Sequence, residues 1–285
     1  MDISGKTQLV CIIGNPIEHS LSPAIQNAAF LALRLNWCYL PFHLFPQDLK
    51  VSVELLRVIQ NLKGANVTVP YKEKVIPFLD GLTTEAREIG AVNTIEVQAD
   101  RTLVGHNTDG RGFVAAFREE IGMSLQGKVG LMVGAGGVAR AVGYRLIKEQ
   151  VREVIFINRT LSRAKGLAQQ MRAWSPQVLS HGLAPDDLKI QDLLKRVDFL
   201  INATSLGLQA SDPLPITLDG LNPNAVVCDL VYRPGGTFFS NLAKEKGWAS
   251  MGGLPMLVHQ GALAFEVWTG QKGPVQVMAE ALQRV

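Results

Sequence analysis

The stretch KVGLMVGAGGVARAVGYRL, residues 128–146, decides the fold. It has the pattern of an apolar strand that turns at glycines and continues as a helix whose apolar face reaches Leu146. Gly134 permits a tight turn, Gly136 lets the backbone approach a pyrophosphate, and Ala139 is small enough for close contact between helix and strand. The first turn of the helix offers unpaired N–H groups to phosphates. The stretch therefore predicts a Rossmann loop that binds a dinucleotide.

The strand after this loop indicates which dinucleotide binds. Residues 154–157 form an apolar run that ends in Asn158, Arg159 and Thr160, about where an NAD enzyme carries an acidic residue for the ribose 2′-hydroxyl. Arg159, with Arg163 one helical turn later, suits a 2′-phosphate instead, which a carboxylate would repel. The alternative is a pair of solvated arginines, although cations near a helix N-terminus are mildly unfavourable. The pattern favours NADP over NAD.

Strand and helix patterns alternate on both sides of the loop. Such alternation implies mostly parallel sheets covered by helices on both faces, which is the α/β fold class. Residues 92–97 are expected to form an edge strand, with 101–105 as its hairpin partner. The other expected strands are 8–14, 39–44, 64–69, 129–133, 153–157, 199–202 and 226–229, and the expected helices are 23–35, 49–61, 72–79, 110–121, 138–148, 161–171, 256–268 and 275–282.

The length predicts two domains. A chain of 285 residues, 47% of them hydrophobic, can bury two ordinary cores. The break between the two alternating series falls near 107–110 without a Pro/Ser-rich linker, so we expect a helix to join the domains. The last two helical patterns have no strand between them and could pack back on the first domain. The predicted organisation is a mostly parallel α/β sheet domain, residues 1–109 with 255–285, and a Rossmann domain, residues 110–254.

Composition narrows the partners. Charged residues make up 19% of the chain and the formal net charge is +3, with no run of Lys or Arg, which argues against nucleic acid or a membrane surface and favours a small molecule. Cys11, Cys38 and Cys228 are odd in number and widely spaced, as buried thiols in a reducing compartment are, and no metal site is predicted. Without a signal or membrane-spanning pattern, we expect a cytoplasmic protein. The sequence leaves homodimer formation open, because self-association depends on surface patches.

Polar residues of the first domain fall in segments that follow expected strands, where open parallel sheets place their ligands. Ser20 and Ser22 could offer two hydroxyls to a carboxylate, or Ser22 could simply cap the next helix, with Pro23 at its first position. Asn66 and Thr68 alternate with apolar residues and are expected on the same face of a strand. These residues predict a polar site beside the sheet.

Charged and amide side chains extend this polar group. Lys72 follows just beyond the strand that carries Asn66, although a lysine there is usually a solvated surface charge. Asp109 lies in the segment His106 to Gly110 and could instead cap the next helix. Asn93 is the remaining amide candidate. The coincidence of a lysine, an aspartate, two asparagines and three hydroxyls beside one sheet favours a binding site over separate structural roles.

The ordered motifs resemble those of the shikimate dehydrogenase family. The matching segments, from residue 10 to about 268, are GNPIEHSLSP, NVTVPYK, GAVNT, NTDG, GAGGVAR, NRTLSRA, NATSLG and LPMLVHQGA. The resemblance implies that the first domain and the C-terminal helices bind substrate, that a Rossmann domain binds NADP(H), and that the cleft between them closes for reaction. It also implies the reversible, NADP-dependent reduction of 3-dehydroshikimate to shikimate, in the pathway to chorismate and the aromatic amino acids.

The resemblance implies a role for each matching residue. Lys72 would donate the proton as charge grows on the reacting oxygen, and Asp109 would orient it in a partly dry site. Ser20 and Ser22 would hold the substrate carboxylate, and Tyr232 would reach the substrate from the cofactor domain. The other residues implied to contact substrate are Asn66, Thr68, Asn93 and Gln260. Those implied to contact the cofactor are Gly134, Ala135, Gly136, Gly137, Val138, Asn158, Arg159, Thr160, Arg163, Thr204, Leu230 and Gly253, the last two near the nicotinamide.

Three alternative functions are also compatible with the sequence. The chain could be a quinate/shikimate dehydrogenase of broader specificity, although NAD-using relatives of that kind tend to carry an acidic residue near Arg159 and Arg163. It could also be an aminoshikimate-type paralogue, because the two arginines say little about the ring substituent. From another class, it could be a catalytically silent NADP-binding regulator, since fold alone does not determine function.

Overall fold

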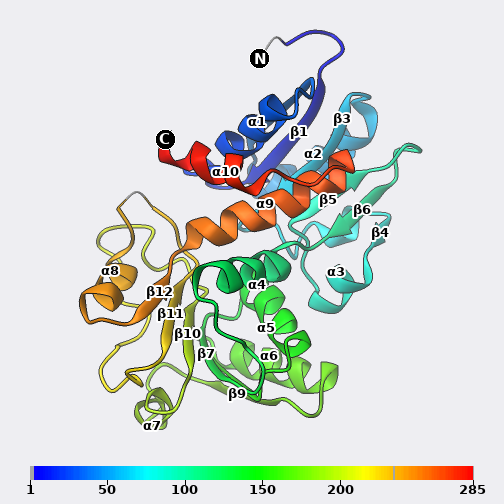
Figure 1. Cartoon of the computed structure of the whole chain (residues 1–285). Helices are drawn as coiled ribbons and strands as arrows, with labels where there is room; N and C mark the ends of the chain where they lie inside the picture. The colour runs from blue at the N-terminus through cyan, green and yellow to red at the C-terminus, as the bar shows by residue number, and fades with distance from the viewer. Residues whose placement is uncertain (1–2, 234, 285) are drawn as a thin grey trace. The chain divides into compact units, whose positions relative to one another are not determined.

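The computed structural model describes residues 3–233 and 235–284, which divide into two compact units (Figure 1). The first unit comprises 1–112 and 257–285, and the second comprises 113–256. The chain passes from the first unit to the second within α4 (Asp109–Glu120) and returns within α9 (Gly253–Thr269). Each unit contains a six-stranded sheet, so the α/β fold class is confirmed.

The sheet of the first unit has the strand order β2-β1-β3-β5-β6-β4. The strand β1 pairs in parallel with β2 and β3, whereas β5 runs antiparallel to β3 and β6. The strands are β1 (Gln8–Gly14), β2 (Trp37–His43), β3 (Leu62–Val67), β4 (Gly81–Leu82), β5 (Thr94–Val97) and β6 (Leu103–His106), and the helices are α1 (Ser22–Ala32), η1 (Pro46–Asp48), α2 (Leu49–Val58), η2 (Ile76–Phe78), α3 (Thr84–Ile89), α10 (Val275–Ala281) and η3 (Leu282–Arg284).

Helices cover both faces of this sheet because each presents an apolar stripe. In α2, Leu49, Val53 and Leu56 recur at helical spacing and pack in one core cluster with β1 and β3. In α1, the buried Phe30 packs against Phe265 of α9, with ring centroids 5.2 Å apart. Figure 1 shows α10 lying along α1, and contacts between the two confirm that the C-terminal helices pack back on the first unit.

Two expectations for this unit are wrong. The expected edge strand at 92–97 is β5, which lies inside the sheet between β3 and β6. Its polar Glu96 has a partner there, because the His106 ring on β6 lies 3.0 Å from the Glu96 carboxylate. The expected helix at 72–79 consists of turns and the short η2. Pro77 explains the difference, because it lacks the N–H that an α-helix interior needs.

The second unit contains an all-parallel sheet with the order β12-β11-β10-β7-β8-β9. Helices α4, α5 and α6 pack on one face, and α7 and α8 pack on the other. Along β7, Met132 faces the first group while Leu131 and Val133 face the second. The elements are β7 (Val129–Val133), α5 (Gly137–Lys148), β8 (Glu153–Ile157), α6 (Leu161–Trp174), β9 (Leu179–Leu183), α7 (Ile190–Leu194), β10 (Phe199–Asn202), β11 (Val226–Asp229), α8 (Phe238–Glu245) and β12 (Ala249–Met251).

Sequence patterning missed the peripheral elements β4, α3, β9, α7, α8 and β12. They are short, and the edge strand β9 (LSHGL) has little apolar alternation because one side of its ladder is unpaired. The three cysteines are buried free thiols, as expected. In the described part of the chain, no helix is long and apolar enough to cross a membrane.

Candidate functional site

Four chain segments come together at one side of the first sheet, where several of its strands end; this side is called the sheet edge below. The parallel strands β1 and β3 both end there, β5 begins there opposite Asn66, and β6 ends there at His106. Loops at this edge therefore share one location, as is usual for ligand sites in open α/β sheets. Lys72 follows β3, Asn93 precedes β5, and Asp109 follows β6.

Lys72 and Asp109 form a largely buried ion pair where these strands end. The ammonium Nζ lies 2.6 Å from the Asp109 carboxylate, and the two side chains are only 13% and 5% exposed. Lys72 is therefore not the solvated surface lysine of the alternative interpretation. Asp109 is the first residue of α4, and its carboxylate binds Lys72 and Asn93. Because separating buried charges is costly, each group holds the other in place.

Asn93 connects the pair to α9. Its amide nitrogen lies 2.9 Å from the Asp109 carboxylate, 2.8 Å from the Thr108 hydroxyl and 3.3 Å from the Gln260 side-chain oxygen. An amide nitrogen carries two hydrogens, so these three acceptors share them. The Asn93 side-chain oxygen accepts from the main-chain N–H of Thr108, and the Thr108 hydroxyl donates to the main-chain carbonyl of Gln260. The side-chain positions in this cluster are therefore mutually determined.

Asn66 lies on the same edge, and Thr68 follows the end of β3. Asn66 is buried; its amide donates to the Asn93 carbonyl and the Thr94 hydroxyl, and its oxygen accepts from the Tyr39 hydroxyl at 2.7 Å. Thr68 is half-buried, and its N–H donates to the carbonyl of Ile13 at the end of β1. Asn66 thus joins the cluster through the Asn93 main chain.

Ser20 and Ser22 lie at the start of α1. Ser22 is the first helical residue rather than the cap, which is Leu21 and makes no side-chain capping bond, so the simple capping alternative is wrong. The Ser22 N–H donates to the Ser20 hydroxyl at 3.3 Å. In the described part of the chain, no hydrogen bond joins either serine to Lys72, Asp109 or Asn93. One turn later, the buried Gln26 donates to the Gly261 carbonyl and ties α1 to α9.

The glycine loop of the second unit leaves the N-terminus of α5 open. Gly134 directly follows β7 and has φ +117°, and a Cβ there would lie 2.7 Å from the Ala203 carbonyl oxygen. Gly136 is the N-cap of α5 and, as a glycine, has no side chain that could cap the helix. A Cβ at this position would meet nothing within 4 Å. The first N–H groups of α5, at Gly137 and Val138, have no partner within the helix, as at any helix N-terminus. Ala135 lies between the glycines and is buried.

The segment after β8 carries the two arginines. Arg159 and Arg163 are both exposed, and neither forms an ion pair within the described residues. Thr160 is the N-cap of α6 without a side-chain capping bond, and the Asn158 amide donates to its carbonyl at 3.0 Å. Guanidinium groups without a carboxylate partner have the chemistry that suits a dianion such as a phosphate monoester.

Three further predicted cofactor residues belong to the second unit. Thr204 follows β10, and its hydroxyl donates to the Asn202 side chain at 2.7 Å. Gly253 begins α9 directly against the segment after β11, because a Cβ there would lie 2.6 Å from the Leu230 carbonyl oxygen. Tyr232 is half-buried two residues beyond Leu230. The structure thus brings Gly253 to Leu230, which are distant in sequence.

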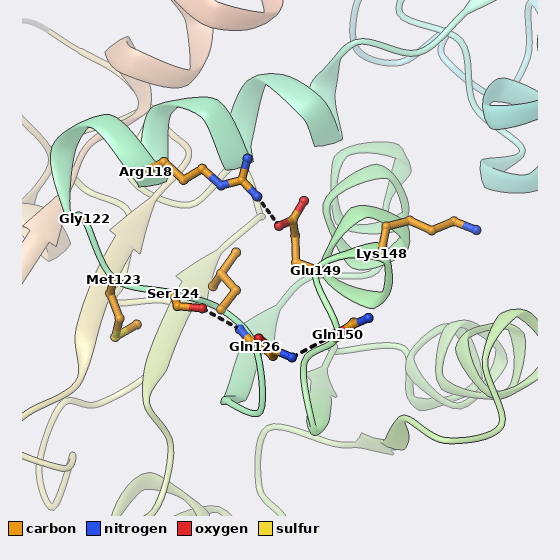
Figure 2. Close-up of a pocket in the computed structure, with 9 residues that line it drawn as sticks. Arg118, Gly122, Met123, Ser124, Gln126, Lys148, Glu149 and Gln150 are labelled. Atoms are coloured by element: carbon orange, nitrogen blue, oxygen red, sulfur yellow. Dashed lines mark hydrogen bonds and ion pairs between the residues drawn. The ribbon is translucent and has the colours of Figure 1, made fainter.

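A pocket of 420 Å³ in the second unit lies away from the glycine loop (Figure 2). It forms at the C-terminal ends of α4 and α5, and Figure 2 shows Arg118 pointing to Glu149. A 12-residue helix is roughly 18 Å long, so the pocket and the glycine loop lie at opposite ends of α5. None of the residues predicted to bind substrate or cofactor lines it.

Sequence reasoning did not assign Thr108 or Tyr39 to the site. Thr108 is fully buried between Asn93 and Gln260, and Tyr39 on β2 is bonded to Asn66. Thr108 lies inside the NTDG motif, directly before the predicted site residue Asp109, and this position was the available signal. No local signal marked Tyr39, because its partner is two strands away in the sheet.

Family models cover most of the chain. The model of the shikimate dehydrogenase substrate binding domain matches residues 12–95, that of shikimate/quinate 5-dehydrogenase matches 117–209, and that of the shikimate 5′-dehydrogenase C-terminal domain matches 253–283. The first match contains Lys72 and Asn93, and the second contains the glycine loop and Thr204.

Similar proteins align along nearly the full length. The shikimate dehydrogenase (NADP(+)) of Desulforamulus reducens is 43% identical over 99% of this chain and 97% of its own. The crystal structure of shikimate 5-dehydrogenase from Thermus thermophilus in complex with NADP(H) and shikimate has a TM-score of 0.86 and 35% identity, covering 98% of this chain and 99% of its own. Quinate dehydrogenase from Corynebacterium glutamicum in complex with NAD has a TM-score of 0.89 and 30% identity, covering 98% and 99%.

Proposed function

The chain belongs to the shikimate dehydrogenase family, and we propose that it catalyses the reversible, NADP-dependent reduction of 3-dehydroshikimate to shikimate. The observation that carries the proposal is the buried pair of Lys72 and Asp109, 2.6 Å apart. A largely buried ammonium beside a carboxylate can stabilise a developing oxyanion and transfer a proton to it.

Lys72 is the proposed acid of ketone reduction. NADPH, when bound, supplies the hydride to the carbonyl carbon. As charge grows on the carbonyl oxygen, Lys72 donates a proton to it, and in shikimate oxidation the same amine accepts a proton. Asp109 orients the ammonium through the 2.6 Å contact, and its second oxygen is held by the Asn93 amide. Because Asn93 also contacts Gln260, polar groups from three chain segments lie close together, which supports the proposal of one substrate position there.

The substrate carries a carboxylate and hydroxyl groups, and each needs hydrogen-bond partners in the protein. We propose that Ser20 and Ser22 bind the carboxylate, since both lie at the N-terminal end of α1, where N–H groups favour an anion. Hydroxyl recognition is proposed for the polar cluster at the sheet edge. Its members, in this proposal, are Asn66, Thr68, Asn93 and Gln260, and Tyr232 is proposed as a further substrate contact.

The residues of the second unit fit NADP(H). The open N-terminus of α5 and the space beside Gly136 suit a pyrophosphate. Arg159 and Arg163 suit the 2′-phosphate that distinguishes NADP from NAD. The proposed cofactor-binding residues are those of the glycine loop, Gly134 to Val138, those after β8, Asn158 to Thr160 with Arg163, and Thr204, Leu230 and Gly253. Accordingly, we assign cofactor binding to the second unit and substrate binding to the first.

The two loop glycines are expected to respond differently to a methyl group. Gly134→Ala places a side chain at φ +117° and against the Ala203 carbonyl, so the free energy of unfolding should fall by about 1–3 kcal/mol. Gly136→Ala has open space around its Cβ and should melt like wild type without cofactor, while losing the rise in Tm that NADP produces. Thermal melts with and without NADP test both variants. A full NADP shift in Gly136→Ala would contradict the proposed pyrophosphate contact.

Substrate and cofactor preference separate the candidate activities. With shikimate and NADP, we expect reduced nicotinamide to form with a kcat/KM at least about tenfold above that for quinate with NAD. The reason is the arginine pair at the end of β8 and the absence of an acidic residue beside it. A preference for quinate with NAD would establish the alternative of a quinate/shikimate dehydrogenase. An absence of turnover together with tight NADP binding would indicate a regulator.

The cellular setting also follows from the proposed reaction. We propose a cytoplasmic enzyme that supplies shikimate for chorismate and aromatic amino acid biosynthesis. Three buried free thiols are consistent with a reducing compartment. A small-molecule substrate is the partner that the polar site supports, and neither nucleic acid nor a membrane is expected. Homodimer formation stays a prediction.

A further inference from the structure

A buried carboxylate is hydrogen-bonded to the segments that carry Thr204 and Leu230, two of the proposed cofactor contacts. Asp229 is the last residue of β11 and is 1% exposed. Its carboxylate accepts from the Asn202 amide at 2.9 Å, from the Val231 N–H at 3.1 Å and from the Thr237 hydroxyl. All three donors are neutral, and burial raises the pKa of the Asp229 carboxyl. A buried carboxyl group without a cationic partner is costly and calls for a specific role.

Asn202 extends the contact to the segment after β10. It pairs with Asp229 in adjacent parallel strands. Its side-chain oxygen accepts from the Thr204 N–H at 3.1 Å and from the Thr204 hydroxyl at 2.7 Å, and its amide donates to the Leu206 carbonyl at 3.0 Å. The segment 203–206 is therefore folded around a side chain that Asp229 holds.

Thr237 brings in a third segment. It is the N-cap of α8, with a reciprocal capping box to Ser240, and is 1% exposed. Gly207 lies against it, since a Cβ at Gly207 would be 3.3 Å from the Thr237 methyl group. Asp229 thus joins the segments 203–207 and 230–231 and the start of α8. Buried networks in which every member has a partner hold one arrangement of their parts.

We propose that Asp229 is a positioning residue, which holds Thr204 and Leu230 in the arrangement that seats the nicotinamide end of NADP(H). The proposal rests on the proposed function, since it takes Thr204 and Leu230 as cofactor contacts. Leu230 follows Asp229 directly, and the bond to the Val231 N–H sets the turn that carries it. Asp229 reaches Thr204 through a single side chain, Asn202. Arg159 and Arg163 lie after a different strand, β8, and no hydrogen bond among the described residues joins them to this network.

The test separates the two ends of the cofactor. Asp229→Asn keeps the shape of the side chain but replaces one acceptor oxygen with a donor, which cannot accept from Thr237. We expect kcat for shikimate oxidation to fall about 10- to 100-fold, since small misplacements of reacting groups have effects of this size. The dissociation constants of adenosine 2′,5′-bisphosphate, which has the 2′-phosphate but no nicotinamide, and of shikimate should stay within about twofold. The primary deuterium isotope effect on kcat, measured with shikimate deuterated at the carbon that gives up the hydride, should be larger than in wild type. If hydride transfer already limits kcat in wild type, the isotope effect should stay the same.

Two outcomes would overturn the proposal. One is wild-type kcat in folded Asp229→Asn. The other is a parallel loss of bisphosphate and shikimate affinity, which would show general destabilisation. If Asp229→Asn does not fold, two variants of Thr237 replace it in the test. Thr237→Val lacks the hydroxyl that donates to Asp229, and Thr237→Ser keeps it. Equal kcat in these two variants would overturn the proposal. Failure of the proposed function is distinguishable, because the wild-type protein would then not oxidise shikimate at all.

Discussion

Replacing Lys72 with alanine is expected to lower kcat for shikimate oxidation by about 10² to 10⁴, the usual contribution of a positioned acid or base. The affinity for NADP should change little, because Lys72 belongs to the polar cluster of the first unit and the glycine loop belongs to the second. Steady-state kinetics gives kcat, and calorimetric titration with NADP gives the affinity. Loss of kcat without loss of NADP binding is the signature of a group that acts in the chemical step.

Suitable controls separate chemistry from folding in this experiment. Lys74 is exposed and lies two residues further on, so Lys74→Ala removes an equal charge and should keep wild-type kcat. Removing one partner of a buried pair leaves Asp109 uncompensated; Lys72→Met keeps most of the side-chain volume, and circular dichroism checks that both variants are folded. Wild-type turnover in a folded Lys72 variant would remove Lys72 from the mechanism.

The second large effect is expected at the arginines. Arg159→Ala and Arg163→Ala should each lower kcat/KM for NADP about 10- to 100-fold, since a hydrogen bond to a charged group is worth about 1.5–3 kcal/mol and about 1.4 kcal/mol is tenfold. The value for NAD should change little, because NAD has no 2′-phosphate. The ratio of kcat/KM for the two cofactors, measured at saturating shikimate, is the deciding quantity.

Lys165 provides the matched control for this pair. It is an exposed cation on the same helix, α6, two residues beyond Arg163, and residues two apart do not share a helix face. Lys165→Ala should therefore keep the NADP preference of wild type. If the arginine variants lost NADP and NAD activity equally, the arginines would not be reading the 2′-phosphate.

Much of the second unit is predictable from local sequence. The strands expected at 129–133, 153–157, 199–202 and 226–229 coincide with β7, β8, β10 and β11. These are central parallel strands, covered by helices on both faces, so each appears as a short continuous apolar run. The turn at Gly134 was predicted from its glycine, and the structure gives the reason in a positive φ and the contact with Ala203.

Less of the first unit follows from local patterns. Turns and the short η2 replace the helix expected at 72–79, and β5 is a central strand rather than an edge strand, because it pairs with both β3 and β6. For the candidate site, motif order singled out Lys72 and Asp109. Their contact is not readable from spacing, since 37 residues and several elements separate them.

The sequence alone specifies the α/β class, the glycine loop, the arginine pair and the identities of the polar groups, because backbone preferences and apolar periodicity act over a few neighbouring residues. Only the three-dimensional fold shows that Lys72 is paired with Asp109, that Asn93 contacts Gln260 from 167 positions away, and that Asp229 is hydrogen-bonded to the segments of Thr204 and Leu230. These contacts arise when strands distant along the chain end at a common sheet edge, so their energies depend on distance through space and leave no mark in local order.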